Sequence, residues 1–344
     1  MTPLPIVAIT SGDPAGVGPE IVVKALARRE VRDCCRPLAI GDARVIAQAA
    51  ALTDSPPVFH AITDVTAARF DADAIDILDL KNVDPEACPP AQVSAAAGRA
   101  AVDYIERAVE LARAGQVDGI VTGPINKAAL QAAGVPYIGH TELLAALTGT
   151  DEMDVTTMLA TPGLRVVHVT RHLPLREVAA HITLQRVLAT IRLTHAGLQH
   201  LGFPAPRLAV AALNPHGGDG GLLGREEIEA IGPAVEAARA ESIAAHGPIP
   251  ADSVFFRAIR GEFDAVVAMY HDQGHIPIKT HGFERSVTVT LGLPLVRTSV
   301  DHGTAFDIAW RGQASAESLE EAIRLAAQLT RRAGFASLHV VWYK

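Results

Sequence analysis

Aromatic residues make up only 4% of the 344 residues, so the hydrophobic core has to be built mainly from Ala, Val, Leu and Ile. The chain has 3 cysteines, Cys34, Cys35 and Cys88, and they do not form a Cys-x-x-Cys metal clamp. So few cysteines are typical of a reducing compartment. No apolar run has the length of a membrane span, and the first residues lack the pattern of a signal peptide. We therefore expect a cytoplasmic protein without a membrane partner.

The chain also lacks any basic run or basic tail, and its formal net charge is -8. This balance argues against nucleic acid as a partner, because nucleic-acid-binding surfaces carry clustered Lys and Arg. An acidic protein can still contain a local positive pocket, so an anionic small molecule remains compatible with the composition. The length of the chain and its 49% hydrophobic content predict two domains with a large core.

Short apolar runs alternate with helical patterns along the chain. Residues 94–115 place Val102, Ile105 and Val109 on one face at helical spacing. Strand-like runs are IVAIT (6–10), VDGIVTG (117–123), LRVVHVT (164–170), RLAVAALN (207–214), DAVVAMY (264–270) and, at the end, SLHVVWYK (337–344). This alternation predicts an α/β fold with mostly parallel sheets, in which loops at the carboxyl ends of strands form the functional site.

No dinucleotide-binding fingerprint follows the first strand. The loop SGDPAGVGPE (11–20) has the wrong glycine spacing, and HGGDGG (216–221) does not stand in the required strand–helix context. The glycines of HGGDGG are explained by a turn in the chain. A nucleotide cofactor would therefore have to bind by another arrangement.

The segment YHDQGHIPIKTHGFERS (270–286) gathers three histidines, a lysine and an arginine. His271 and His275 have the i, i+4 spacing of a zinc pair on a helix. However, Gly274 and Pro277 argue against a helix, and no glutamate stands where a metalloprotease has its base. We therefore reject a protease-like zinc helix.

A different set of histidines is compatible with a metal site. His172, His216 and His271 each follow an apolar run, so each is expected near the carboxyl end of a strand, at one edge of the sheet. Three neutral imidazoles leave coordination positions open, as a catalytic divalent ion requires. Zinc suits nitrogen ligands, and hexacoordinate ions remain open. The alternative is that each histidine is an ordinary hydrogen-bonded loop residue.

Positively charged residues follow shortly after His271. Lys279 lies within the apolar frame IPIK, and Arg297 follows GLPLV, so both emerge from apolar sequence. A lysine point charge with an arginine fork is a sound arrangement for holding a phosphate. The alternative is an ordinary basic surface, which is the expectation for Arg285.

Eight ordered motifs carry a resemblance to a known family. They are TSGDPAGVGPE, GPINK, GHTE, HLPLR, LNPHGGDGG, PADSVF, YHDQG and LGLPLVRTSVDHGTAFDIA. Together, from about Ile6 to Leu329, they resemble the 4-hydroxythreonine-4-phosphate dehydrogenase family. The resemblance implies a two-domain fold like that of isocitrate and isopropylmalate dehydrogenases. It implies a cofactor-side domain of residues 1–135 plus about 300–344, and a metal, substrate and dimer domain of about 136–299.

The resemblance also implies roles for individual residues. The metal ligands would be His172, His216 and His271, which is the same trio as above. The substrate contacts would be His140, Thr141, Lys279, Arg297 and Thr288, the last at a position where the family usually has asparagine. The loop HGTAFDIA, with Gly303, Thr304 and Asp307, would hold the adenosine half of NAD or NADP. Lys127 and Asp252 would serve in proton transfer or support the metal side.

The activity implied is a metal-dependent oxidation and decarboxylation with NAD or NADP and one Zn, Mg or Co ion per subunit. The first expectation is 4-phosphonooxy-L-threonine going to 3-amino-2-oxopropyl phosphate and CO2 in pyridoxal phosphate (vitamin B6) biosynthesis. The segment GHIPIK (274–279) departs from the biosynthetic enzyme and instead resembles a paralogous group acting on 4-phospho-D-threonate or 4-phospho-D-erythronate in sugar-acid catabolism. A cis-dihydrodiol dehydrogenase ranks lower, and a non-catalytic or metal-hydrolase protein is the alternative from another class. The resemblance further implies a homodimer with the active site at its interface.

Overall fold

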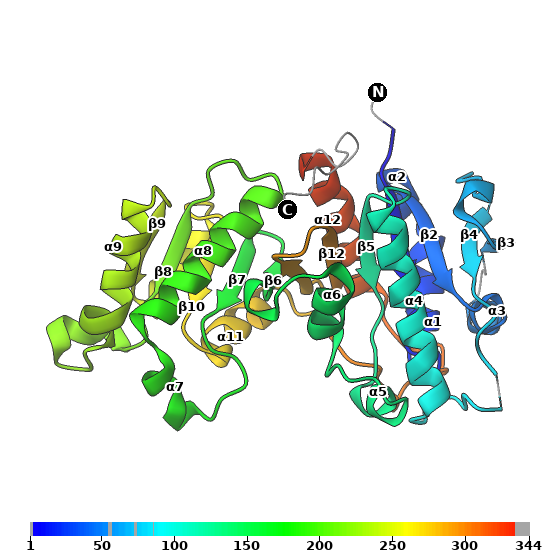
Figure 1. Cartoon of the computed structure of the whole chain (residues 1–344), viewed down its shortest axis with the longest axis horizontal. Helices are drawn as coiled ribbons and strands as arrows, with labels where there is room; N and C mark the ends of the chain where they lie inside the picture. The colour runs from blue at the N-terminus through cyan, green and yellow to red at the C-terminus, as the bar shows by residue number, and fades with distance from the viewer. Residues whose placement is uncertain (1–2, 54–56, 72–73, 85, 334–344) are drawn as a thin grey trace. The chain divides into compact units, whose positions relative to one another are not determined.

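The protein divides into two compact units in a computed structural model (Figure 1). Unit 1 comprises Met1–Glu152 and Leu293–Lys344, and unit 2 comprises Met153–Gly292. The sequence-based divisions were 135/136 and about 299/300, so the segment around His140 stands in unit 1 rather than in the second domain. The structure describes residues 3–53, 57–71, 74–84 and 86–333. The strand expected over 337–344 lies outside these residues.

Unit 1 is built on a parallel sheet with strand order β3-β4-β2-β1-β5-β12. Its strands are β1 (Ile6–Thr10), β2 (Arg36–Gly41), β3 (Val58–Ile62), β4 (Ala74–Asp79), β5 (Gly119–Thr122) and β12 (Val296–Val300). Its helices are α1 (Gly18–Ala27), α2 (Arg29–Cys34), α3 (Ala43–Ala50), η1 (Val65–Ala67), α4 (Ala95–Arg113), α5 (Lys127–Ala132), α6 (His140–Thr148) and α12 (Glu317–Ala333).

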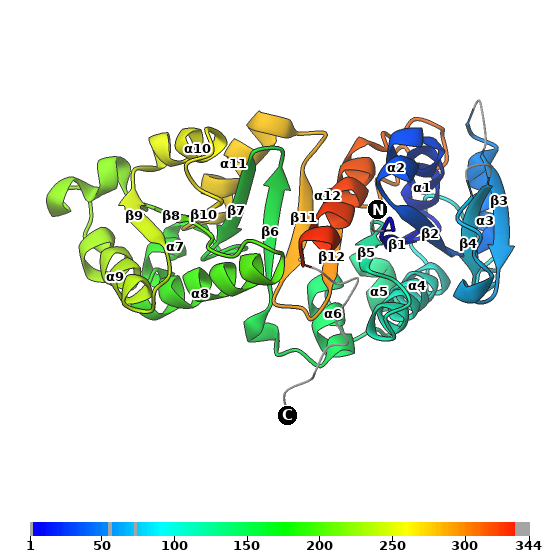
Figure 2. The ribbon, with the colours of Figure 1, turned by 90° about the horizontal axis from the view of Figure 1, so that it is seen from above.

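Helices cover both faces of the unit 1 sheet. Helices α1 and α12 lie on one face, and α4 and α5 lie on the other (Figure 2). Helix α4, which the helical spacing predicts, begins after Ser94, whose hydroxyl accepts a hydrogen bond from the amide of Ala97. Val102, Ile105 and Val109 are buried on its inner face, as expected. The carboxyl ends of β1, β5 and β12 then meet at one edge of the sheet, because the three strands are parallel.

Unit 2 has a mixed sheet with strand order β11-β6-β7-β10-β8-β9. The strands are β6 (Thr156–Thr161), β7 (Leu164–His168), β8 (Leu208–Ala211), β9 (Ala245–Ile249), β10 (Ala265–Ala268) and β11 (Val287–Leu291). The helices are η2 (Glu152–Asp154, at the division), α7 (Leu175–His181), α8 (Leu184–His200), η3 (Pro215–Gly221), η4 (Glu227–Ile231), α9 (Gly232–Ala240), α10 (Ala251–Ile259) and α11 (His271–Gly282).

The two kinds of pairing in unit 2 follow from its connections. The β6–β7 hairpin and the β6–β11 pair are antiparallel, whereas β7, β10, β8 and β9 pair in parallel. Helices α10 and α11 cover one face, and α8 and α9 cover the other (Figure 2). Val166, Val266 and Ile278 are fully buried in the core beneath α10 and α11. The predicted α/β class with mostly parallel sheets is therefore confirmed. Among the described residues no helix is long and apolar enough to cross a bilayer.

Helix α11 contradicts the sequence-based expectation, which placed no helix at His271–His275. Pro277 lies inside this helix and removes one backbone hydrogen bond, a defect of about 3 kcal/mol. Tertiary contacts offset it. The buried side chain of Gln273 accepts a hydrogen bond from the amide of Met269 at 2.7 Å and donates one to the carbonyl of Ala212 at 2.7 Å. These bonds, together with the buried Ile278, fix the first turns against the sheet.

Candidate functional site

The guanidinium of Arg297 is buried at the edge of the unit 1 sheet, with only 3% of the residue exposed. Strand β12 carries it, and its Nε donates a hydrogen bond to the hydroxyl of Thr122 on β5 at 3.1 Å. The Thr122 hydroxyl in turn donates to Ser299 Oγ at 2.9 Å. Burial lowers the pKa of Arg297 to about 9. A buried cation held by hydroxyl groups is a suitable receptor for an anion.

His140 lies next to this guanidinium. It is the first residue of α6, and its Nε2 atom is buried without a hydrogen-bond partner. Burial first, and the positive charge of Arg297 second, lower the pKa of His140 well below its usual value, while the backbone of Gly123 opposes the shift. The imidazole is therefore neutral at physiological pH. A buried polar atom without a partner is a candidate contact for a ligand. Thr141, also predicted, follows in the first turn of α6.

The predicted cofactor loop is tied to the first loop of unit 1. The carbonyl of Thr304 accepts a hydrogen bond from the amide of Val17 at 3.0 Å. A side chain at Gly16 would overlap with Thr304, because its Cβ would lie 2.8 Å from the Thr304 Cβ. Asn126 reaches the same loop through a 3.3 Å hydrogen bond from its amide nitrogen to Thr304 Oγ1. Gly303 and Asp307 are exposed beside it, so the loop offers a carboxylate to solvent.

Asp13, in the loop after β1, was not among the predicted site residues. It is 1% exposed, its Oδ1 accepts a hydrogen bond from Ala15 N at 2.8 Å, and its Oδ2 has no partner. Burial raises the pKa of Asp13 to about 6, against the weaker opposing effect of the Ala15 hydrogen bond. The sequence gives a partial signal, because Asp13 stands in a glycine-rich loop at a strand end.

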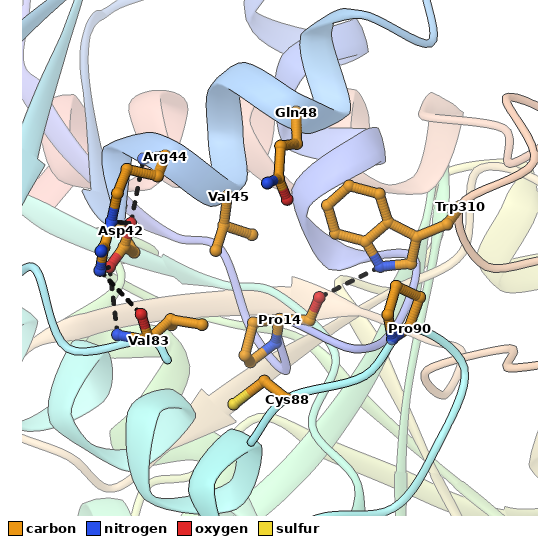
Figure 3. Close-up of a pocket in the computed structure, with 9 residues that line it drawn as sticks. All are labelled: Pro14, Asp42, Arg44, Val45, Gln48, Val83, Cys88, Pro90 and Trp310. Atoms are coloured by element: carbon orange, nitrogen blue, oxygen red, sulfur yellow. Dashed lines mark hydrogen bonds and ion pairs between the residues drawn. The ribbon is translucent and has the colours of Figure 1, made fainter. Parts of the chain in front are cut away.

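A small pocket opens in unit 1 between this loop and α3 (Figure 3). Trp310 forms one wall and donates a hydrogen bond from its indole nitrogen to the carbonyl of Pro14 at 3.2 Å. Asp42 is engaged by Arg44 and by the amide of Val83, so its carboxylate is already satisfied. None of the sequence-predicted site residues lines the pocket. Its residues are Pro14, Asp42, Arg44, Val45, Gln48, Val83, Cys88, Pro90 and Trp310.

In unit 2 the structure brings two of the three predicted metal ligands together. The ring centroids of His172, in the loop after β7, and His271, at the start of α11, are 5.8 Å apart. Two imidazoles that share an ion at metal–nitrogen distances of about 2.1 Å have centroids roughly 5 to 6 Å apart, so the pair fits a divalent ion. His271 Nδ1 also contacts Asp272 Oδ1 at 2.7 Å, the kind of support that metal-binding histidines receive.

The third predicted ligand does not join them within one chain. Among the described residues no three His, Cys, Asp or Glu side chains stand close enough to hold a metal ion. His216 is exposed in η3, where residues 216–220 have positive φ angles. The carboxylate of Glu227 supports this turn by accepting hydrogen bonds from the amides of Leu213 and Asn214 at 2.8 and 2.7 Å.

Lys279 and Thr288 also stand in unit 2. The Lys279 ammonium donates a hydrogen bond to Ser286 Oγ at 2.9 Å and lies 4.9 Å from the ring centroid of Phe283. Thr288 is half-buried on β11, opposite Leu159 of β6. Arg285 is exposed, as expected.

The two predicted proton-transfer residues are exposed. Lys127 is the first residue of α5, and Asp252 stands in the first turn of α10. Asn126, beside Lys127, caps α5 by accepting a hydrogen bond from the amide of Ala129. In the first turn of α10 the Asp252 carboxylate also interacts favourably with the helix dipole.

The chain is similar to named proteins over nearly its whole length. The profile of the family described as "Pyridoxal phosphate biosynthetic protein PdxA" matches residues 33–326. "D-threonate 4-phosphate dehydrogenase" of Cupriavidus necator is 52% identical over 332 residues, which is 96% of this chain and 99% of that protein.

Two solved structures show the same likeness. A 4-hydroxythreonine-4-phosphate dehydrogenase from Burkholderia phymatum has a TM-score of 0.84 and 49% identity, with 95% of this chain and 98% of that chain covered. The Klebsiella pneumoniae 4-hydroxythreonine-4-phosphate dehydrogenase has a TM-score of 0.87 and 43% identity, with coverage of 95% and 99%. The protein with the buried Arg297 and the paired histidines therefore belongs to the PdxA family of dehydrogenases.

Proposed function

We propose that this family member oxidises and decarboxylates 4-phospho-D-threonate with NAD and a divalent metal ion. As a PdxA-type protein it is a dehydrogenase of 4-phosphorylated hydroxy acids. The name of the Cupriavidus relative, at 52% identity, favours the sugar-acid phosphate. The sequence-based first choice, 4-phosphonooxy-L-threonine, therefore becomes the second candidate.

The observation that carries the proposal is the buried cation of Arg297 beside the unpartnered Nε2 of His140. Taking a guanidinium out of water is unfavourable unless an anion or strong acceptors surround it. A phosphate or carboxylate supplies both charge and acceptor oxygens. Arg297 and Lys279 are proposed to hold the phosphate, while His140, Thr141 and Thr288 orient the remaining oxygens.

The substrate reacts in two balanced steps. A hydride leaves C3 for the nicotinamide, and the C3 hydroxyl loses its proton, which gives a 3-keto acid. The bond to the carboxylate carbon then breaks, CO2 leaves, and the resulting enolate takes up a proton at C2. The products are dihydroxyacetone phosphate, CO2 and NADH. Lys127 and Asp252 are proposed as the groups that move these protons.

Gly303, Thr304 and Asp307 are proposed to hold the adenosine side of NAD or NADP. The exposed Asp307 carboxylate suits ribose hydroxyls, and Asn126 fixes Thr304. His172, His271 and His216 are proposed to hold one divalent ion, with Zn, Mg and Co as the candidates. When bound, the ion supplies Lewis-acid stabilisation of the oxygen that becomes charged.

A homodimer that shares each metal site between subunits is part of the proposal. The support is that His172 and His271 are neighbours in one chain whereas His216 does not join them. Unit 2 also exposes large apolar side chains that a partner could cover, among them Leu175, Leu222 and Phe256.

A substrate panel tests the proposed activity. The protein is assayed for nicotinamide reduction with 4-phospho-D-threonate, 4-phospho-D-erythronate and 4-phosphonooxy-L-threonine, each with NAD and NADP. We expect the highest kcat/KM with 4-phospho-D-threonate and NAD, with dihydroxyacetone phosphate formed in equal amount. A preference for 4-phosphonooxy-L-threonine would restore the biosynthetic alternative, and no reduction with any compound would remove the proposal.

Mixing two inactive variants tests the shared site. His216→Ala and His271→Ala dimers are each expected to be inactive, and we expect activity to return when their subunits are exchanged. Up to about a quarter of the sites would then be intact, because half of the dimers are mixed and each mixed dimer has one complete site. If both histidines belong to one subunit's site, mixing recovers no activity.

A further inference from the structure

The imidazole of His275 lies flat against that of His271, the candidate metal ligand. Their ring centroids are 3.6 Å apart and the ring planes differ by 11°. His275 Nδ1 also contacts the carbonyl oxygen of His271 at 3.0 Å, one helical turn back. Asp272 Oδ1 contacts Nδ1 at the edge of the His271 ring at 2.7 Å. The His271 ring is therefore held in its plane by a carboxylate and on one face by a second ring.

His275 is itself supported from behind. Its ring centroid lies 4.8 Å from that of His168, at the end of β7, and the two planes are tilted by 33°. His168 is 5% exposed, and burial is the main cause that lowers its pKa to about 3, so this ring is neutral. Strand pairing between His168 and Ala268 anchors it to the sheet.

The close approach of these rings depends on the absence of a side chain at position 274. A Cβ on Gly274 would lie 2.2 Å from His168 Nε2 and 2.7 Å from Val166 Cγ1. Glycine therefore lets the first turn of α11 lie against β7. From the sequence alone, Gly274 argued only against a helix.

His275 is poorly placed to be a metal ligand together with His271. A metal ion lies in the plane of each imidazole that binds it. Two nearly parallel rings 3.6 Å apart cannot share one in-plane ion, and the Nδ1 of His275 already contacts a carbonyl. The arrangement instead resembles the outer contacts that fix the orientation of a ligating ring.

We propose that His275 is a positioning residue that orients the His271 imidazole for metal binding, with His168 and Gly274 as its support. The proposal rests on the proposed function, because it takes His271 as a metal ligand. His275 acts through the ring face that it presents to His271. An aromatic ring of similar shape should therefore replace most of its effect, whereas a small side chain should not.

Cobalt(II) binding without substrate tests the proposal. Affinity is measured by competition with a chelator, and the visible absorption spectrum of bound Co(II) reports its coordination. We expect His275→Ala to weaken Co(II) binding about 10- to 100-fold, the range found for contacts to metal ligands. His275→Phe should recover most of the affinity with an unchanged spectrum.

Two further variants separate the possible failures. His271→Ala should abolish Co(II) binding. His281→Ala is the matched control, since this exposed histidine lies near the end of α11 and its Nε2 contacts the carbonyl of Pro162. Unchanged affinity in His275→Ala, with binding lost in His271→Ala, would overturn the positioning role and leave the metal site standing. Unchanged affinity in His271→Ala would overturn both proposals. A changed spectrum in both His275 variants would make His275 a ligand and overturn positioning.

Discussion

Arg297 and Thr122, which are far apart in the sequence, are joined inside unit 1 by a hydrogen bond of 3.1 Å from the guanidinium Nε to the threonine hydroxyl. Parallel pairing of β12 with β5 brings them together, because Arg297 is paired with Ile120, two residues before Thr122 on β5. Thr122 thereby fixes the orientation of a buried cation before any substrate arrives. Such preorganisation reduces the free energy that binding has to supply.

Replacing Arg297 with alanine tests its role in phosphate binding. We expect the KM for 4-phospho-D-threonate to rise about 10- to 100-fold, because a charge-assisted hydrogen bond contributes roughly 1.5 to 3 kcal/mol. The KM for the dephosphorylated acid should change much less. Arg297→Lys serves as the control that keeps the charge but loses the fork. An equal rise for both substrates would remove the phosphate role.

Replacing His140 with leucine separates binding from stability. The unpartnered Nε2 of His140 lowers the free energy of unfolding by about 1 to 3 kcal/mol. The leucine variant should therefore unfold at an equal or higher temperature. Its kcat/KM should nevertheless fall at least about tenfold if the imidazole contacts substrate. Thermal melting and steady-state kinetics on the same preparation check both. A parallel loss of stability and activity would indicate a structural role.

Asp13 should make the stability of the protein fall as pH rises. Below about pH 4 the carboxyl is protonated in both states, and it adds nothing to pH dependence. Between its usual pKa of 3.8 and its folded pKa of about 6, the folded state keeps a proton that the unfolded state releases, so the free energy of unfolding decreases. Above this window the penalty is constant, at up to about 3 kcal/mol.

Asp13→Asn removes that titration while it keeps the oxygen that accepts from Ala15. The variant should match the parent near about pH 4 and exceed it in stability by up to about 3 kcal/mol near about pH 8. Urea unfolding across this pH range measures the difference. A difference that stays constant with pH would show that Asp13 ionises normally in the folded protein.

Gly274→Ala should destabilise unit 2, although alanine is usually the better helix residue. Its Cβ would lie 2.2 Å from His168 Nε2, and overpacking of this kind destabilises a protein by about 1 to 3 kcal/mol. The same substitution in a His168→Ala background should destabilise less, because the clash with the ring is removed and only the 2.7 Å contact with Val166 Cγ1 remains. Equal destabilisation in both backgrounds would locate the cause in the backbone or in Val166.

The sequence was most informative where local patterns agree with tertiary packing. Helix α4 and the strand ends that carry Thr122 and His168 could be predicted, since helical periodicity and short apolar runs place them. Helix α11 could not, because its stability depends on the distant carbonyl of Ala212, which Gln273 reaches across the fold. For the same reason the stacking of His275 on His271 was missed. The burial of Asp13 depends on neighbouring loops that no local pattern reveals.

The identity of the substrate is the property that the sequence predicts least well. The segment GHIPIK (274–279) favoured the sugar-acid group, and Thr288 departs from the family's asparagine, whereas the shared motifs favoured the biosynthetic enzyme. Both candidate substrates carry the terminal phosphate and the hydroxyl that is oxidised, so the residues proposed to bind phosphate and metal carry little information on the atom attached to C2. Relatives named for D-threonate 4-phosphate shift the balance.

The turn that carries His216 twists in the mirror-image sense of every α-helix in the protein, with φ values of 54, 73, 77, 44 and 65° from His216 to Gly220. L-Alanine at Gly217 would meet only Pro250, at 4.0 Å, so handedness rather than space excludes it. A D-amino acid would suit this position. The position of His216, one of the candidate metal ligands, thus depends on glycine, which has no chiral Cα.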